Sequence, residues 1–245
     1  MQGADDARRR LFADISHELR TPLTVIRGEA EIALRGREKS IEDYQTSLRR
    51  IVDQANHTAR LVDDLLFVAR TDAGEPRLKM QVVAVVELVQ QVSSDAQALS
   101  ASKNISVALD LGIPRVTITA DPERLGQALM VVIDNAIRYS RPHEQIAVGI
   151  HAHVQGVSVQ ITDNGIGISP AEIEQVFERY YRGGGAERQH SAGSGLGLPI
   201  AKAIIVAHGG EISLDSAPGR GTRATIVLPV SRRLHARNPD LPGVA

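Results

Sequence analysis

The sequence predicts an α+β protein in two parts, a long helical hairpin followed by a domain that mixes strands and helices. Up to Arg70, apolar residues recur in steps of three and four, which is the pattern of packed helices. After the turn-forming segment 71–76, runs of alternating apolar and polar residues predict strands. We therefore expect domains at residues 1–73 and 74–231. The tail at 232–245 is polar and contains proline, a composition typical of disorder.

The hairpin is predicted from two long amphipathic segments. The first helix runs from about Asp5 to Arg35, the chain breaks at Gly36, and the second helix runs from about Ser40 to Arg70. The second helix has a nearly unbroken seam at Ile41, Tyr44, Leu48, Ile51, Ala55, Thr58, Val62, Leu65 and Ala69, widened by Leu61 and Leu66. This stripe is too wide for one partner helix, so we expect two hairpins to pack as a dimeric four-helix bundle. A plain coiled coil without chemistry is the alternative.

The second part alternates strand and helix patterns. Predicted strands cover Leu78–Val83, Ile105–Asp110, Val116–Thr119, Gln145–His153, Val157–Thr162, Glu211–Asp215 and Arg223–Pro229. Predicted helices cover Val85–Leu99, Asp121–Tyr139 and Leu196–His208. The middle helix has the clearest start, because Asp121 can cap its first N–H groups and Pro122 suits the first turn.

Composition excludes several classes of function. A net charge of −1 over 245 residues argues against a surface for nucleic acid. The absence of cysteine excludes disulfides, thiol catalysis and thiolate metal sites, and suits the cytosol. No apolar run approaches the roughly 20 residues that cross a bilayer, and the N-terminus lacks signal-peptide character. We expect a cytoplasmic chain, either a soluble protein or the cytoplasmic portion of a membrane-bound one whose other segments are absent here.

One histidine in the first predicted helix stands out. His17 lies two residues from the nearest seam positions, so it should face solvent. Glu18 follows it directly, and Thr21 shares its face one turn later. Pro22 removes a backbone donor, which predicts a kink just beyond the histidine. A single exposed histidine is usually only a solvated surface residue, so its neighbours decide its significance.

The string His17-Glu-Leu-Arg-Thr-Pro22 resembles the phosphoacceptor box of the sensor histidine kinases of two-component systems. The resemblance implies that His17 attacks the γ-phosphate of ATP, with Glu18 as base or as the carboxylate that keeps the other ring nitrogen protonated. It implies that Thr21 orients water when the enzyme dephosphorylates its partner. It also implies a homodimer, a response-regulator receiver domain as partner, and an ATP-binding α/β sandwich like that of DNA gyrase and heat-shock chaperone ATPases.

A second motif lies in the helix predicted from Asp121. Its core face is Leu125, Leu129, Val132, Ile133 and Ala136, and a different face carries Val131, Asp134, Asn135 and Arg138. The run from Asp134 to Tyr139 resembles the N-box of these kinases. The resemblance implies that Asn135 holds Mg²⁺, that Arg138 reaches phosphate and that Tyr139 lies near adenine. Val131 stands where the family usually has another asparagine, which implies weaker phosphate contacts or, at the extreme, an impaired kinase.

Two further segments resemble the family's G1 box and F-box. The run Asp163-Asn-Gly165-Ile-Gly167 ends a predicted strand and resembles the G1 box. The resemblance implies that Asp163 accepts a hydrogen bond from the adenine amino group, while Gly165 and Gly167 let the backbone approach the ring. The run 177–182 resembles the F-box and makes Arg182 a candidate phosphate contact.

A glycine-rich stretch opens the last predicted helix. Gly193, Gly195, Gly197 and Leu198 belong to a segment that resembles the G2 box. Glycines before a helix expose N–H groups and the positive end of the helix dipole, which together suit phosphate. The stretch is neither a Walker loop nor a Rossmann fingerprint.

Two other functions remain open on sequence alone. One is an ATPase of the gyrase and chaperone kind that forms no phosphohistidine, against which the complete string around His17 argues. The other is a non-catalytic dimerisation scaffold, which Val131 keeps open. An acid-labile label on the protein separates the first from a histidine kinase, and binding of Mg-ATP separates the second.

Overall fold

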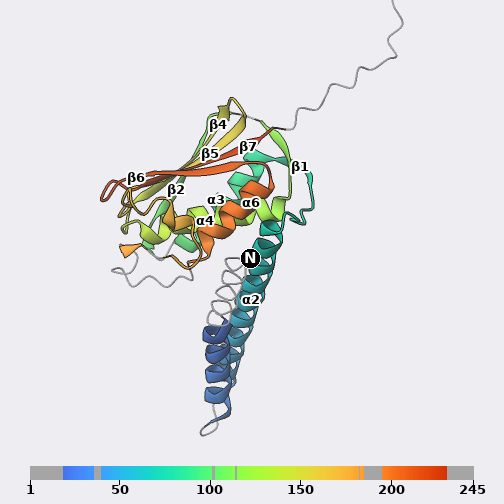
Figure 1. The fold of residues 1–245 in the computed structure, drawn as a ribbon. Helices are drawn as coiled ribbons and strands as arrows, with labels where there is room; N and C mark the ends of the chain where they lie inside the picture. Colours follow the sequence, from blue (N-terminus) through green and yellow to red (C-terminus); the bar gives the residue numbers. More distant parts are fainter. Residues whose placement is uncertain are drawn as a thin grey trace, which may run out of the picture. The chain divides into compact units, whose positions relative to one another are not determined.

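The chain forms two compact units, Met1–Arg77 and Leu78–Ala245, in a computed structural model (Figure 1). The structure describes residues 19–35, 40–100, 103–113, 115–181, 183–184 and 195–230. The tail predicted at 232–245 lies outside these ranges. Within the described residues, no helix combines the length and the apolar character that crossing a membrane requires.

The first unit is a pair of helices. Residues 19–34 are helical, and α2 follows as Ile41–Asp72. Ser40 starts α2 with a capping box, in which its Oγ accepts from the N–H of Asp43 at 3.1 Å and its own N–H donates to the Asp43 carboxylate at 3.2 Å. Across the pair, Arg50 Nη1 lies 3.2 Å from Glu29 Oε1. The predicted start at Asp5 and break at Gly36 lie outside the described residues.

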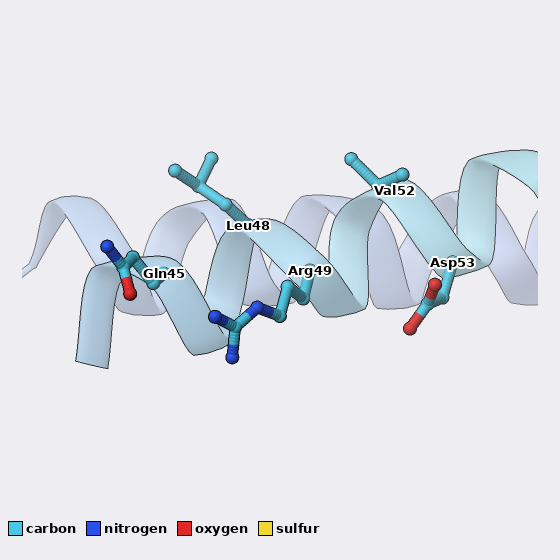
Figure 2. A pocket seen from close by; sticks show the side chains of 5 residues that line it. All are labelled: Gln45, Leu48, Arg49, Val52 and Asp53. Atoms are coloured by element: carbon cyan, nitrogen blue, oxygen red, sulfur yellow. The ribbon is translucent and has the colours of Figure 1, made fainter. Parts of the chain in front are cut away.

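The apolar seam predicted for α2 divides between a buried and an exposed face. Leu61, Leu65 and Val68 are buried, whereas Leu48 and Val52 are 58% and 55% exposed. These two side chains project from the same side of α2 and line a shallow hollow of about 330 Å³ with Gln45, Arg49 and Asp53 (Figure 2). Within a single chain, α2 therefore leaves an apolar face uncovered.

The second unit is built on a five-stranded sheet in the order β2-β4-β5-β7-β6. Its strands are β2 (Ser106–Leu111), β4 (Gln145–His153), β5 (Gly156–Asp163), β6 (Glu211–Ser216) and β7 (Thr222–Pro229). The β2 and β4 strands are parallel, and the other neighbours are antiparallel. A separate antiparallel pair joins β1 (Gln81–Ala84) to β3 (Thr117–Ala120).

Helices cover one face of this sheet (Figure 1). They are α3 (Val85–Ser100), α4 (Pro122–Tyr139) and α6 (Gly197–Ala207). A short 3₁₀ helix, η2, consists of residues Gln175–Phe177. Side chains alternate across a strand, so every second residue faces the helices. On that face Ile150, Val159 and Ile226 pair across three strands and are fully buried. The opposite row at Gly149, Gln160 and Thr225 is more polar, as expected of a two-layer α/β sandwich.

Most predicted elements of this unit are confirmed, and one strand begins later than expected. The core face predicted for α4, from Leu125 to Ala136, is buried, and Asp121 caps the helix by accepting from two N–H groups. The strand predicted from Leu78 begins only at Gln81. The N–H of Lys79 instead donates to Asp121 Oδ2 at 2.8 Å, which directs the chain to the start of α4 before it joins the ladder.

Candidate active site

The phosphoacceptor segment lies at the edge of the described residues. His17 and Glu18 fall outside the described ranges, and the kink predicted from Pro22 stays a prediction. Thr21 is exposed on the helix that spans 19–34, and the helix continues through Pro22. The hydroxyl of Thr24 bonds back to the carbonyl of Arg20 at 2.8 Å. Thr21 therefore presents its side chain to solvent on a continuous helix.

Asp163 is the buried polar residue around which the nucleotide motifs gather. It ends β5, pairs with Thr222 of β7 and is 8% exposed. Its Oδ1 accepts from the N–H groups of Gly165 at 2.8 Å and Thr222 at 3.2 Å. Because both backbone donors bind the same oxygen, neither of them is directed at the other oxygen, Oδ2.

Burial raises the pKa of Asp163 above its ordinary value of 3.8. The Gly165 and Thr222 N–H groups act in the opposite direction, and the negative charge of Glu144 adds to the rise. Removing a carboxylate from water disfavours its charged form, which is why desolvation is the largest cause. Ionising the Asp163 carboxyl is therefore unfavourable in the free protein, and an additional hydrogen-bond donor would stabilise its charged form.

The end of α4 packs against the turn that follows Asp163. The N–H of Ile166 donates to the carbonyl of Tyr139 at 3.3 Å, and a Cβ on Gly165 would lie only 2.5 Å from that carbonyl oxygen. Contact this close requires glycine at 165. Asp163 and Tyr139, predicted from separate motifs to lie near adenine, are thus brought together.

Gly167 is a second position in this turn that requires glycine. Its φ is +68°, a left-handed conformation that favours glycine, and a Cβ there would overlap the carbonyl oxygen of Ala217. The neighbouring Ile166 carbonyl accepts from Gly219 N–H at 2.7 Å. These contacts fix the G1-like turn against the connection between β6 and β7.

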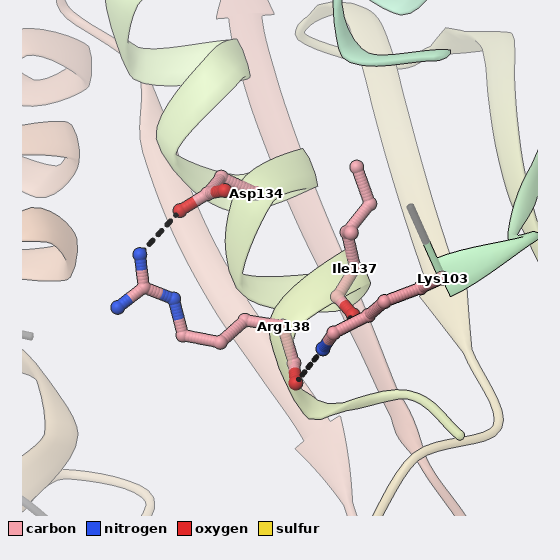
Figure 3. A network of polar contacts seen from close by, with 4 residues as sticks. All are labelled: Lys103, Asp134, Ile137 and Arg138. Atoms are coloured by element: carbon pink, nitrogen blue, oxygen red, sulfur yellow. Dashed lines mark hydrogen bonds and ion pairs between the residues drawn. The ribbon is translucent and has the colours of Figure 1, made fainter. Parts of the chain in front are cut away.

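The polar face predicted on α4 exists, and its side chains are partly exposed. Asn135 is half-buried, and Arg138 Nη2 lies 3.0 Å from Asp134 Oδ2 one turn earlier (Figure 3). Arg138 is thereby turned back along the helix toward Asp134. An amide oxygen and a guanidinium on adjoining turns suit a phosphate chain and the hard cation that accompanies it.

Val131 lies on the same stripe, next to the start of α6. It is half-buried, and its Cγ1 would be 3.2 Å from a Cβ placed on Gly197. The valine methyl therefore packs against the backbone of the first residue of α6. Position 131 adjoins the helix start that was predicted to hold phosphate.

The start of α6 has the features of an anion site. Gly197 is its first residue, Leu198 is half-buried, and no side chain among the described residues caps the helix. Its first N–H groups point along the positive end of the helix dipole. Gly193 lies outside the described residues.

A close contact joins the F-box-like and G2-like segments. The N–H of Tyr180 donates to the carbonyl of Gly195 at 3.0 Å, and Gly195, at φ +70°, would place a Cβ 2.8 Å from Tyr180 backbone atoms. Tyr180 itself has φ +63°, an uncommon conformation for a tyrosine. The chain is thus pinned on both sides of the stretch that contains Arg182, a residue outside the described ranges.

Two residues of this region were missed by sequence reasoning. Thr222 supplies one of the two N–H groups on Asp163, and its place after the Gly219–Gly221 turn was the available signal. Glu172 accepts from the Ser169 hydroxyl, from Gly184 N–H at 3.0 Å and from Tyr181 Oη at 3.3 Å. The Ser169 hydroxyl, followed by the Gly184 N–H, lowers the pKa of Glu172. Its spacing from Ser169 is that of a capping box, which could have revealed it.

The described residues contain no group of three or more histidine and acidic side chains placed to hold a metal ion. Mg²⁺ commonly binds proteins through one or two side chains together with substrate phosphates. Asn135, a single side-chain oxygen donor on the polar face of α4, fits an ion that arrives with a nucleotide.

The second unit is thus a two-layer sandwich in which Asp163 is buried at the end of β5 and α6 begins at a glycine. Residues 120–232 match the family described as histidine kinase-, DNA gyrase B- and HSP90-like ATPase, and residues 7–74 match the His Kinase A (phospho-acceptor) domain. The chain therefore belongs to the sensor histidine kinases, the protein-histidine kinases of two-component systems.

Several relatives support this membership. The phosphate regulon sensor protein PhoR of Pseudomonas aeruginosa is 33% identical over 221 residues, which are 90% of this chain and 50% of PhoR. The sensor protein SrrB of Staphylococcus aureus is 33% identical over 225 residues, which are 92% of this chain and 38% of SrrB. The chain thus spans half of the length of PhoR and less than half of the length of SrrB.

Solved structures agree with the fold. The Acinetobacter baumannii histidine kinase AdeS superposes with a TM-score of 0.68 at 26% identity, covering 88% of this chain and 98% of that one. The mycobacterial sensor histidine kinase MprB has a TM-score of 0.54 at 30% identity, covering 61% and 97%. ShkA in complex with AMPPNP has a TM-score of 0.65 at 27% identity, covering 90% and 45%.

Proposed function

We propose that this chain transfers the γ-phosphoryl group of ATP to His17. The lone pair on one imidazole nitrogen of His17 attacks the γ-phosphorus, a P–N bond forms, and the bond to the bridging oxygen breaks to release ADP. Glu18 takes the proton from the other nitrogen, or holds it in place to fix the tautomer. Most of the catalysis then consists of positioning and charge neutralisation.

The nucleotide is held by three parts of the second unit. Asp163 accepts a hydrogen bond from the adenine amino group, Tyr139 lies beside the ring, and Gly165 and Gly167 leave room for it. Phosphates lie at the start of α6, against Gly193, Gly195, Gly197 and Leu198, with Arg138 and Arg182 as cationic contacts. Asn135 supplies a side-chain oxygen to Mg²⁺, which neutralises phosphate charge.

The observation that carries this proposal is the convergence on Asp163. Its Oδ1 is taken by two backbone donors, at 2.8 and 3.2 Å, and the carbonyl of Tyr139 closes the turn behind it. A buried carboxylate with one oxygen left over is suited to a ligand amino group. The nucleotide analogue in the ShkA complex is consistent with this use of the fold.

Incubation with γ-labelled ATP tests the proposal. A label on the protein that is lost in acid and kept in base is expected, because phosphoramidates hydrolyse in acid. ATP hydrolysis without protein label would favour an ATPase of the gyrase and chaperone kind. Failure to bind Mg-ATP would favour a scaffold.

Within the same proposal, the working form is a homodimer. Helix α2 leaves Tyr44, Leu48, Val52, Val62 and Leu66 at least one-third exposed, and a second copy of the hairpin would bury them in a four-helix bundle. The phosphoryl group then passes from His17 to an aspartate of a response-regulator receiver domain. ATP as donor places the reaction in the cytoplasm.

The same active site is proposed to remove phosphate from the partner. Thr21 is exposed one turn from His17, where its hydroxyl can orient water. We expect Thr21→Ala to keep autophosphorylation and to slow dephosphorylation of a phosphorylated receiver domain about tenfold or more, as for loss of one positioning hydrogen bond. Thr24→Ala, whose hydroxyl bonds its own helix, is the matched control. Equal loss of both activities in Thr21→Ala would indicate helix damage instead.

Position 131 offers a test of the phosphate site. Because Val131 adjoins the first residue of α6, an asparagine there could reach phosphate or a water on Mg²⁺. We expect Val131→Asn to tighten Mg-ATP binding or to raise the autophosphorylation rate. A hydrogen bond to a charged group contributes about 1.5–3 kcal/mol, so the gain should not exceed roughly a hundredfold.

Nucleotide titration and thermal melts on the same variant check this prediction. Val131→Ala is the control, because it removes the packing contact without supplying an amide. Unchanged affinity with a lower melting temperature would show that the valine is structural, since burying an unpaired amide costs about 1–3 kcal/mol.

A further inference from the structure

The last turn of α4 carries two of the proposed nucleotide contacts, Arg138 and Tyr139. The final carbonyls of a helix lack partners within the helix and must find them elsewhere. Here Ala136 O accepts from Ser140 N–H at 3.1 Å and Tyr139 O accepts from Ile166 N–H at 3.3 Å. The two carbonyls between them, at Ile137 and Arg138, need another donor.

Lys103 supplies that donor. Its Nζ lies 2.8 Å from the carbonyl oxygen of Arg138 and 3.2 Å from that of Ile137 (Figure 3). A positive charge at the C-terminus of a helix also interacts favourably with the helix dipole. One ammonium group therefore completes the hydrogen bonding of the turn that presents Arg138.

The lysine is itself held in place. It is half-buried, and its carbonyl accepts from the N–H of His143 at 3.3 Å, in the connection that follows α4. The chain from α3 to β2 is thus tied to the end of α4 through both the backbone and the side chain of Lys103. Because the backbone of Lys103 is held in place, its ammonium group can restrain the carbonyl groups that it binds.

Arg138 is restrained from two sides. Lys103 binds its backbone carbonyl, and Asp134 binds its guanidinium at 3.0 Å from one turn earlier. The direction of a long side chain depends on the φ and ψ of its own residue, so loosening the carbonyl would loosen the guanidinium. The two contacts set where Arg138 points before any phosphate arrives.

We propose that Lys103 is a positioning residue of the nucleotide site, which orients Arg138 toward the phosphates of ATP by capping the end of α4. The proposal rests on the proposed function, since Arg138 must contact phosphate. Lys103 itself need not touch the nucleotide.

Lys103→Met is the test variant, because it keeps the aliphatic stem and removes all donors. Its affinity for Mg-ATP should fall roughly tenfold, while its affinity for adenosine, measured by NMR shift titration, should stay within about twofold. Lys103→Arg keeps charge and donors and should restore Mg-ATP binding. Lys79→Met, at an exposed lysine of the same unit, is the matched control. Equal weakening of Mg-ATP and adenosine binding would mean that Lys103 only supports the fold, which overturns the proposal.

A double-mutant cycle with Arg138→Met identifies the residue through which Lys103 acts. If the lysine works by orienting Arg138, the combined variant should bind Mg-ATP almost as well as Arg138→Met alone. Additive losses would overturn the proposal. If Lys103→Met does not fold, Lys103→Gln, which retains one amide group, enters the same cycle.

The wild-type titration separates this inference from the proposed function. A wild-type chain that does not bind Mg-ATP contradicts the proposed function itself. A wild-type chain that binds Mg-ATP, with a Lys103→Met variant that binds equally well, contradicts only the role of Lys103.

Discussion

Asp163→Asn is expected to lose most of its affinity for ATP while its fold stays intact. Two backbone N–H groups hold Oδ1 of residue 163, so an asparagine would keep its oxygen there and turn its NH₂ toward the nucleotide. An amide donor would then face the donating adenine amino group. Loss of a charged hydrogen bond at about 1.5–3 kcal/mol predicts a fall in affinity of roughly 10- to 150-fold.

The stability of this variant should respond to pH in a defined direction. Burial raises the pKa of Asp163 in the folded chain above its ordinary 3.8, so the folded state favours the protonated form. The resulting stabilisation is complete below the unfolded pKa and is lost as the pH rises through the folded pKa. An asparagine does not titrate. The melting temperature of Asp163→Asn relative to wild type should therefore rise from acid toward neutral pH.

Nucleotide titration and melts over this pH range check both expectations. Asp215→Asn is the control, because Asp215 is exposed on β6 at the far edge of the sheet. Unchanged affinity for ATP in Asp163→Asn would contradict the assignment of the adenine site. A melting temperature of Asp163→Asn that falls relative to wild type as the pH rises would contradict the account of burial.

His17→Ala is expected to abolish autophosphorylation completely and to leave Mg-ATP binding and dimerisation unchanged. The proposed nucleophile is lost, whereas the proposed nucleotide contacts all lie in the second unit. A substitution at a position that the sequence predicts to face solvent should alter stability by only about 0.5 kcal/mol. Label transfer from ATP, nucleotide titration and sedimentation measure the three properties on one preparation.

His57→Ala provides the matched control, because His57 is an exposed histidine on α2 of the same unit. It should autophosphorylate as the wild type does. Acid-labile label that persists in His17→Ala would show that another residue accepts the phosphoryl group.

Sequence periodicity was sufficient for most of the secondary structure. The predicted helix from Asp121 to Tyr139 matches α4, and the predicted strand Gln145–His153 matches β4 residue for residue. The α4 segment is amphipathic and starts with an acidic N-cap residue followed by proline. The β4 segment alternates apolar and polar residues and is flanked by turn residues. Local chemistry alone decides such boundaries.

The strand pairing near Leu78 and the seam of α2 were not decided locally. The start of β1 depends on a bond from Lys79 to Asp121, which is 42 residues away in sequence. Which apolar residues of α2 are covered within one chain depends on the rotation of the helix against its neighbours. A short stretch of sequence specifies neither a contact between residues that are far apart in the chain nor the rotation of a helix against its neighbours.

For the site, the residue types proposed to carry the chemistry could be predicted from sequence, because the motifs around His17, Asn135, Asp163 and Gly197 are each local strings. How those strings support one another depends on the tertiary fold. Thr222 meets Asp163 through strand pairing 59 residues apart, and Lys103 meets Arg138 across 35 residues. Buried carbonyls and carboxylates must find partners wherever the fold brings donors close, and that requirement appears only once the chain has folded.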